Sequence, residues 1–383
     1  MNSILNMTFA DIPLFTGEPM VDYFGRLNEI IPTSPMKPSD HPEEWPKGNE
    51  MDLPNSYTYS GQEKSTREFL AATGTSALVI IRDGKLSFED YWLTGGSKVT
   101  WLSMSVAKSF VSALVGIALD DGSIRSLEDP ISEYIPVDNG SAYDGVKILD
   151  VLQMSSGARW NEDYSDPNSD ARRMALAMGE DGSLDQLVAT AVREFEPGTI
   201  CRYNSGDTQA LGSLLVHATG KSLTDYMQEK LVNPLGFTNS SYWLTDVQGR
   251  EAAFAGLNLT ARDYARLGQV YLDSGKWRGE QIVPDWYVAD SSVPTSLHTQ
   301  PGKPILSGNA IELGYGYQWW VPSKQDGSFT ALGVYNQLIF VHPSSRTVIV
   351  KLSANTNYGT SMDESTNRDL ENIALLHSLA TSV

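Results

Sequence analysis

Apolar residues form strand-like runs in two regions that lie far apart in the sequence. Residues 77–81 are uninterruptedly apolar, and a second run at 86–92 follows the pair Asp83-Gly84. An Asp-Gly pair between two such runs favours a type I′ turn, so this segment predicts a β-hairpin. Near the C-terminus, residues 319–321, 338–341 and 347–350 read as strands, the last two joined by a turn at 343–346. A closing helix is expected over residues 367–379.

Between these regions the pattern is mainly helical. Residues 105–119 are apolar nearly all round, which is typical of a helix buried inside a protein, and Asp121-Gly122 ends it. From residue 124 to 255 helical segments alternate with loops at 155–157, 166–168 and 196–198. Strands at both chain ends and helices between them predict an α+β fold, in which one antiparallel sheet is built from both ends.

The same pattern predicts three parts. An α/β domain comprises residues 76–123 and 256–383, and a mainly helical domain, 124–255, is inserted into it. Eight of the 19 prolines precede residue 55, so residues 1–75 are expected to form an irregular arm on the surface. Phe15 and Phe24 in this arm should pack against the rest of the protein.

Composition narrows the class of function. Hydrophobic residues make up 41% of the chain and charged residues 20%, as in an ordinary globular protein. A net charge of −19 argues against partners such as nucleic acid or an anionic membrane. The longest apolar stretch is too short to span a bilayer and no signal-peptide pattern is present, so we expect a cytoplasmic protein. Oligomeric state is left open between monomer and homodimer.

Metal and disulfide chemistry are not expected. Cys201 is the single cysteine, which excludes an intrachain disulfide and a cysteine-based zinc site. The five histidines are scattered, with no pair at metal-ligand spacing, so each is expected to have an ordinary surface or core role; they are His41, His217, His298, His342 and His377. No organic cofactor motif is present either, because Gly314-Tyr315-Gly316 lacks the context of a dinucleotide site.

Two Ser-x-x-Lys sequences are candidates for nucleophilic chemistry. The first, Ser34 to Lys37, falls in the proline-rich arm, where nothing fixes the pair, and is taken as coincidence. The second, Ser105 to Lys108, opens the buried helix, and positions i and i+3 share a helix face. Burial and the helix dipole both favour loss of the lysine proton, and a neutral amine can activate a serine. The alternative is an N-capping serine beside a lysine that extends to solvent.

Two further segments carry groups that such a site needs. Tyr203 lies on a loop before an apolar helix and could shuttle a proton, although a buried structural tyrosine is the alternative. Residues 331–334 predict a strand whose Gly333 lets a ligand approach the backbone closely. The neighbouring carboxylates Glu162 and Asp163 should point to opposite sides of an extended chain, so they are not expected to form an acid–base couple.

These segments together resemble the serine β-lactamase-like hydrolases. The matching stretches follow in order over roughly residues 70–380, and they are SMSVAKSF (103–110), LDDGSIRSLEDPISEYIP (119–136), LDVLQMSSG (149–157), EPGTICRYNSGDTQALGSLL (196–215), LVNPLGF (231–237), LTARDYARLG (259–268) and GVYNQLIFVHP (333–343). The branch concerned contains class C β-lactamases, DD-peptidases, family VIII esterases and 6-aminohexanoate-dimer hydrolases. WNEDYSDP (160–167) and TVIVKLS (347–353) are most similar to the last group.

The resemblance implies a β-lactamase/transpeptidase-like fold and a set of roles. Ser105 would be the acylated nucleophile, Lys108 its base and Tyr203 the proton shuttle. The backbone N–H groups of Ser105 and Val334 would form the oxyanion hole. Substrate-pocket candidates implied by the resemblance or by position are Trp160, Tyr164, Ser205, Gly333 and Tyr335.

Two departures from the family pattern bear on which class of substrate we expect. Ser205 stands two residues after Tyr203, where class C β-lactamases have asparagine, and Ala331-Leu332-Gly333 replaces their Lys-Thr-Gly. Without that lysine a β-lactam carboxylate loses its cationic partner. We therefore expect a serine hydrolase of small ester or amide substrates, without metal or organic cofactor. The alternatives are a weak β-lactamase or DD-peptidase, or a non-catalytic binding protein on the same fold. Specificity is expected to lie in the loops around 158–185 and 290–312.

Overall fold

A seven-stranded antiparallel sheet organises the structure, a computed structural model that describes residues 7–179, 182–302, 313–322 and 326–382. In spatial order its strands are β11 (Gly314–Tyr315), β12 (Trp320–Val321), β13 (Phe329–Gly333), β14 (Gln337–His342), β15 (Thr347–Ser353), β4 (Thr75–Arg82) and β5 (Lys85–Tyr91). Pairing of β15 with β4 joins the two chain ends, with Val350 opposite Val79. The predicted sheet built from both ends is therefore confirmed. The predicted hairpin is also present, and its turn residues Asp83 and Gly84 have φ values of 50° and 70°.

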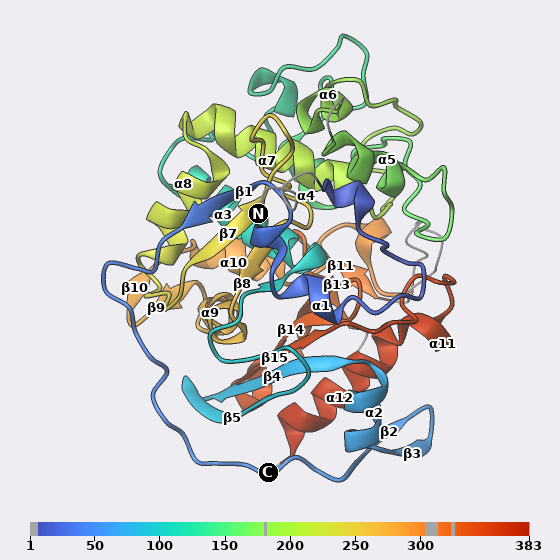
Figure 1. Cartoon of the computed structure of the whole chain (residues 1–383). Helices are drawn as coiled ribbons and strands as arrows, with labels where there is room; N and C mark the ends of the chain where they lie inside the picture. The colour runs from blue at the N-terminus through green and yellow to red at the C-terminus, as the bar shows by residue number, and fades with distance from the viewer. Residues whose placement is uncertain (1–6, 180–181, 303–312, 323–325, 383) are drawn as a thin grey trace.

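The central strands β14 and β15 are buried along their whole length because helices cover both faces of the sheet (Figure 1). On β4, Leu78 and Ile80 face a core shared with α12 (Asp369–Thr381), whereas Val79 and Ile81 face the larger core. That second face is covered by α9 (Ala261–Leu272), where a Cβ on Gly268 would lie 2.5 Å from a Val348 methyl. A glycine at this point lets the helix pack directly on the sheet.

The helix predicted over residues 105–119 is the centre of the larger core. It begins with the 3-10 turn η3 (Met104–Val106) and continues as α3 (Ala107–Asp120), of which only the C-terminal end is not buried. Helix α3 packs against α7 (Ser205–Thr219), and Gly116 lies so close to Tyr287 that a Cβ would clash with its ring. The element that carries Ser105 and Lys108 is therefore held on all sides.

Helices dominate residues 124–255, as predicted. Beyond residue 120, the other helices of the described residues are η4 (Ile131–Glu133), α4 (Ile148–Leu152), α5 (Asp170–Ala177), α6 (Leu184–Ala189), α8 (Leu223–Met227), the π-helix η5 (Gln228–Val232), α10 (Asp285–Ser291), η6 (Leu297–Thr299), η7 (Pro343–Ser345) and α11 (Glu364–Asn367). A two-stranded ribbon pairs β9 (Lys276–Trp277) with β10 (Glu280–Gln281). The part of the chain that the structure describes contains no helix long and apolar enough to cross a membrane.

The N-terminal 75 residues are more regular than predicted. They contain η1 (Phe9–Asp11), α1 (Val21–Phe24), η2 (Leu27–Glu29), β1 (Thr33–Met36), β2 (Ser56–Tyr59), β3 (Gln62–Ser65) and α2 (Thr66–Ala72). Strand β1 is the edge of a four-stranded sheet, followed in space by β7 (Ser241–Leu244), β8 (Leu257–Leu259) and β6 (Trp101–Leu102). The expectation of an irregular arm was wrong here because Pro35 lies on an edge strand, the position in a sheet at which proline is tolerated.

Candidate active site

The Ser105 hydroxyl and the Lys108 amine lie 3.1 Å apart on the first turns of the buried helix. Both side chains are buried, Lys108 to 1% exposure. Met104, directly before Ser105, has a φ of +46°, a strained conformation for a residue with a side chain. The other Ser-x-x-Lys pair begins on the strand β1, where residues three apart point to opposite faces. The structure thus supports the distinction made from the sequence.

Three polar groups surround the Lys108 amine. Its Nζ contacts Ser105 Oγ at 3.1 Å, Ser205 Oγ at 3.1 Å and the carbonyl oxygen of Phe254 at 2.8 Å. Ser205 donates its own proton to Glu162 at 2.6 Å, so it accepts from the lysine, as does the Phe254 carbonyl. A neutral amine has two N–H donors for these acceptors and one lone pair for the Ser105 O–H. The three N–H groups of an ammonium satisfy the same three contacts, so this arrangement accommodates both protonation states of Lys108.

Burial makes that neutral form accessible near physiological pH. Desolvation lowers the pKa of Lys108 to about 8, and the negative charge of Glu162 opposes the shift. The desolvation effect is the larger one. Lys108 is therefore suited to accept a proton from Ser105.

Tyr203 lies on the same side of the site, on the loop before α7. Its ring stacks on Trp320 with centroids 5.1 Å apart, and Lys108 Nζ is 5.2 Å from its centroid. Burial raises the pKa of the Tyr203 phenol above its usual value, and the nearby Glu162 charge adds to the rise, while a hydrogen bond with Ser105 opposes it. The phenol consequently remains protonated at neutral pH, as a proton donor must.

Gly333 brings the end of β13 against the turn that carries the nucleophile. A Cβ on Gly333 would lie 2.7 Å from the carbonyl oxygen of Ser103 and 3.0 Å from the backbone nitrogen of Ser105. The sequence prediction that this glycine admits a ligand needs correction, because its close neighbour is the chain's own backbone. The following residue, Val334, lines the cavity at Ser105. Glycine at 333 thus lets the backbone of Val334 and that of Ser105 share one site.

Glu162 belongs to the site although the sequence analysis set it aside. Its carboxylate accepts the Ser205 hydroxyl at 2.6 Å and the Ser205 backbone N–H at 3.1 Å, and it also accepts from Tyr164 at 3.1 Å. The indole N–H of Trp160 donates to it as well. Glu162 is buried next to the lysine network, whereas the Asp163 carboxylate accepts from Ser165 within its own turn. In the sequence Glu162 lies between Trp160 and Tyr164, and these two aromatic residues were the available indication that its carboxylate is buried.

The predicted pocket residues fall into two groups. Tyr164 and Ser205 line cavities that open at Ser105. Trp160 and Tyr335 are not among the described residues of those cavities. Trp160 lies behind Glu162 and against Gly206, whereas Tyr335 is 1% exposed and packs under Phe15 and Tyr358. Both support the pocket from outside.

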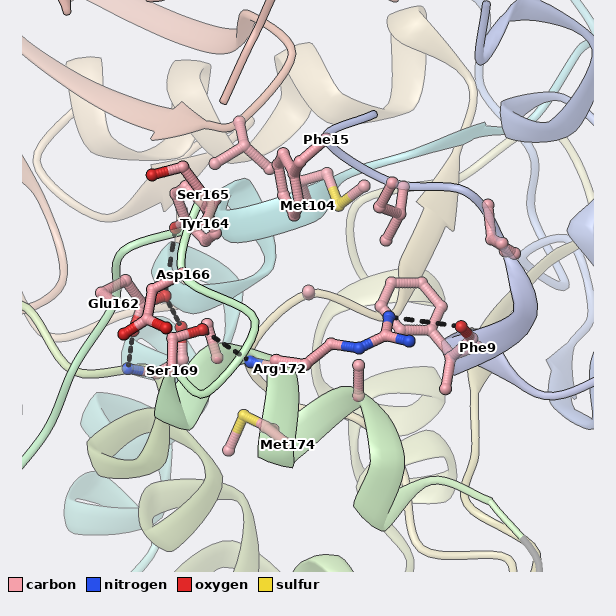
Figure 2. Close-up of a pocket in the computed structure, with 18 of the residues that line it drawn as sticks. Phe9, Phe15, Met104, Glu162, Tyr164, Ser165, Asp166, Ser169, Arg172 and Met174 are labelled. Atoms are coloured by element: carbon pink, nitrogen blue, oxygen red, sulfur yellow. Dashed lines mark hydrogen bonds between the residues drawn. The ribbon is translucent and has the colours of Figure 1, made fainter. Parts of the chain in front are cut away.

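Two cavities meet at Ser105. The larger, about 480 Å³, is lined mainly by apolar residues of the arm, η3 and α5, with Arg172 also in its wall. Figure 2 shows the Arg172 side chain extending toward the segment that carries Phe9, where it donates to the Ala10 carbonyl at 3.3 Å. The smaller cavity, about 230 Å³, is bounded by Tyr203, Trp320 and a group of carboxyl side chains. Of the loops expected to set specificity, 158–185 contributes to the larger cavity, and 303–312 lies outside the described residues.

The arm forms one wall of the larger cavity, a contribution that the sequence did not indicate. Residues 9–16 all line it. Phe15 fixes this segment, because its ring stacks on Tyr164 at 4.5 Å and on Tyr335 at 5.3 Å. Its backbone N–H donates to the Tyr335 hydroxyl at 2.6 Å.

Comparison with known proteins agrees with this geometry. A family model described as Beta-lactamase matches residues 64–374, most of the chain. The chain belongs to the beta-lactamase family. It is 28% identical over 337 residues to the 6-aminohexanoate-dimer hydrolase of Paenarthrobacter ureafaciens, covering 86% of this chain and 84% of that protein. It is 27% identical over 277 residues to a D-alanyl-D-alanine-carboxypeptidase/endopeptidase of Escherichia coli (strain K12), covering 66% and 71%.

A solved structure extends the likeness to the whole fold of this beta-lactamase family member. It is a protein from Bacillus anthracis, provisionally described as a 6-aminohexanoate-dimer hydrolase, with a TM-score of 0.83. The two chains are 24% identical, and the match covers 99% of this chain and 97% of the other. The family resemblance and the fold class predicted from the sequence are therefore confirmed. The related proteins named here are hydrolases, and this chain is a hydrolase of the same family.

Proposed function

We propose that this protein cleaves ester or amide bonds of small, linear substrates through a covalent acyl-enzyme on Ser105. The observation that carries the proposal is the buried pair of Ser105 and Lys108, 3.1 Å apart, at the junction of two cavities. A binding protein would have no need of a serine next to an amine whose pKa burial lowers to about 8. The relative that acts on 6-aminohexanoate dimer supports a linear amide as one substrate class.

In the proposed mechanism Lys108 takes the Ser105 proton while Oγ attacks the substrate carbonyl carbon. Charge develops on the carbonyl oxygen, which accepts hydrogen bonds from the backbone N–H groups of Ser105 and Val334. Tyr203 then delivers a proton to the departing alkoxide or amine and receives the one that Lys108 took from Ser105, so the acyl group remains as an ester on Ser105 and both groups are restored. Water attacks that ester and gives a proton to Lys108, the C–O bond to Ser105 breaks, and Lys108 returns the proton to the Ser105 oxygen as the acid product leaves.

The charge around the smaller cavity bears on the choice of substrate. Its described lining includes Glu162, Asp363 and Glu364, and no lysine or arginine among the described residues lines it. A carboxylate of a β-lactam or of a peptide terminus would be repelled there. This argument favours neutral or cationic groups in that cavity and supports an esterase or amidase over a β-lactamase or DD-peptidase.

A serine-directed label tests the covalent step directly. A fluorophosphonate probe should add one mass equivalent to the folded protein and to the Ser34→Ala variant, but not to Ser105→Ala. Ser34 is the matched control because it opens the other Ser-x-x-Lys sequence. Absence of any Ser105-dependent label on folded protein would sink the proposal.

Turnover assays then separate the substrate classes. Rates on p-nitrophenyl butyrate, nitrocefin and the linear 6-aminohexanoate dimer should show ester or dimer hydrolysis well above nitrocefin cleavage. Ser105→Ala, Lys108→Ala and Tyr203→Phe should each lower kcat by orders of magnitude and combine non-additively, because the three groups act as one unit. Nitrocefin as the preferred substrate would favour the β-lactamase alternative.

A further inference from the structure

The turn that carries Val334 is strained at two successive residues. Strands β13 and β14 pair Gly333 with Gln337, so Val334, Tyr335 and Asn336 form the connection between them. Tyr335 and Asn336 have φ values of 64° and 65°, in the left-handed region. Asparagine adopts this region more readily than most residues, but a tyrosine there is an outlier that its surroundings must hold in place. The strain lies directly beside Val334, which the proposed mechanism assigns to the oxyanion hole.

The backbone N–H of Val334 is free to bind a ligand. Val334 lines both cavities that meet at Ser105. Its N–H has no hydrogen-bond acceptor among the described residues, although the residue is only 7% exposed. A buried backbone N–H is rarely left without an acceptor in a folded protein. A donor that binds the substrate must be free in this way.

Asn336 fixes this turn through a buried network of amide groups. The side chain is fully buried, and its Nδ2 donates to the Asn367 carbonyl at 2.7 Å and to Asp369 Oδ1 at 3.1 Å. Its Oδ1 accepts from Asn355 Nδ2 at 2.9 Å. Three of the four hydrogen bonds that a side-chain amide can make are thus formed. All these partners lie outside the hairpin, so they hold the turn relative to the rest of the protein.

Neighbouring side chains add to this anchorage. Gln337 Nε2 donates to the Val334 carbonyl at 3.2 Å and to the Ser353 carbonyl at 2.7 Å, and its Oε1 accepts the Ser353 N–H at 3.0 Å. Asn336 differs from Gln337 in two respects. It is itself left-handed, and its partners Asn367 and Asp369 line the smaller cavity. Asn336 therefore connects the wall of that cavity to the turn that carries Val334.

We propose that Asn336 is a positioning residue, whose amide network holds the turn in the conformation in which the Val334 N–H donates to the substrate carbonyl oxygen. Asn336 is not among the described residues that line the two cavities, so it acts through Val334. The inference rests on the proposed function, because it needs negative charge to develop on that oxygen. The oxyanion hole stabilises the transition state more than the bound substrate, so loss of the network should lower kcat and change KM little.

Asn336→Gly tests this role because glycine adopts a positive φ without strain and lacks only the amide. With p-nitrophenyl butyrate its kcat should fall roughly 10- to 100-fold, while KM changes by less than about threefold. Asn372→Ala is the matched control. Asn372 is equally buried, but its Nδ2 donates to the Arg368 carbonyl at 2.8 Å and not to the turn. This control should keep the kcat of the parent, and far-UV CD and Tm check that both variants are folded.

A thionoester separates a positioning role from a general loss of structure. In the matched O-aryl thionobutyrate the charge develops on sulfur, a weaker hydrogen-bond acceptor than oxygen, so the oxyanion hole contributes less to its hydrolysis. The ratio of kcat for the ester to kcat for the thionoester should fall roughly 10-fold in Asn336→Gly and stay at the parent value in Asn372→Ala. An unchanged kcat or an unchanged ratio in folded Asn336→Gly would overturn the inference. The proposed function would still stand if the fluorophosphonate probe labels Ser105 in the parent, and both would fail without that label.

Discussion

The pH dependence of the proposed reaction follows from the burial of one residue, Lys108. Desolvation lowers its pKa to about 8, so its neutral form increases as pH rises through that value. We expect log(kcat/KM) for p-nitrophenyl butyrate to rise with a slope near one below about pH 8 and to level off above it. The raised pKa of Tyr203 predicts no falling limb before about pH 10. Rates from pH 6 to 10, corrected for spontaneous hydrolysis, provide the check, and a flat profile would remove Lys108 as the base.

Glu162 tunes this titration through charge. Its carboxylate raises the pKa of Lys108, and it also holds Ser205, which contacts the amine. In Glu162→Gln the rising limb of the pH–rate profile should therefore move to lower pH. The value of kcat should fall roughly 10- to 100-fold, because Ser205 loses its hydrogen bond to the Glu162 carboxylate. Asp163→Asn is the matched control, since the partners of the Asp163 carboxylate among the described residues are the backbone N–H and hydroxyl of Ser165 in the same turn. If the midpoint of the rising limb moves equally in both variants, the overall surface charge and not Glu162 determines it.

At the residue scale, site residues that lie a few positions apart on one helix could be predicted from the sequence. Site residues that come together from distant segments could not. Ser105 and Lys108 are three residues apart on a helix that its apolar sequence already marks as buried. Glu162 reaches the lysine network through Ser205, a contact between elements that are distant in the sequence. No short-range pattern encodes such a contact, which is why the place of Glu162 beside Asp163 in the sequence did not reveal its role.

At the element scale, the arm supplies a wall of the larger cavity and should restrict its size. Phe15 holds this wall by stacking on Tyr164 and Tyr335. Phe15→Ala should enlarge the cavity, so the ratio of kcat/KM for p-nitrophenyl laurate to that for the butyrate should rise roughly 10-fold. Leu53→Ala, also in the arm but packed against the core beside α12, should leave the ratio unchanged. An unchanged ratio in Phe15→Ala would show that the arm does not limit the acyl chain.

The arm also shows why prediction of elements succeeded in one region and failed in another. The hairpin and the central strands are specified by local runs of apolar residues and an Asp-Gly turn. Strand β1 contains Pro35 and has no such run, so its sequence does not predict a strand. It forms one because it pairs with β7 at the edge of a sheet. The division into three domains remains a prediction from the pattern.

At the scale of the whole molecule, stability should depend on buried acids as well as on surface charge. Burial raises the pKa of Asp207 to about 7, although bonds from Ser156 and Tyr143 partly oppose this. An unfolded chain would ionise this carboxyl near pH 4, so the native state binds the extra proton between about pH 4 and 7. Folding stability must therefore fall as pH rises through that window and remain lower above it, by on the order of 4 kcal/mol for the full shift.

Replacing Asp207 by asparagine should remove this pH dependence. Oδ1 of Asp207 accepts from Ser156, Tyr143 and Asn204, while Oδ2 has no hydrogen-bond partner among the described residues. Asparagine keeps the accepting oxygen and stays uncharged, so Asp207→Asn should be more stable than the parent at pH 8 and nearly equal to it at pH 4.5. Urea unfolding at pH 4.5, 6, 7 and 8 measures the difference. The exposed Asp138→Asn makes the same change in net charge and should follow the parent curve, because only the buried carboxyl carries the desolvation cost. A difference between Asp207→Asn and the parent that does not grow with pH would show that Asp207 is ionised in the native state throughout.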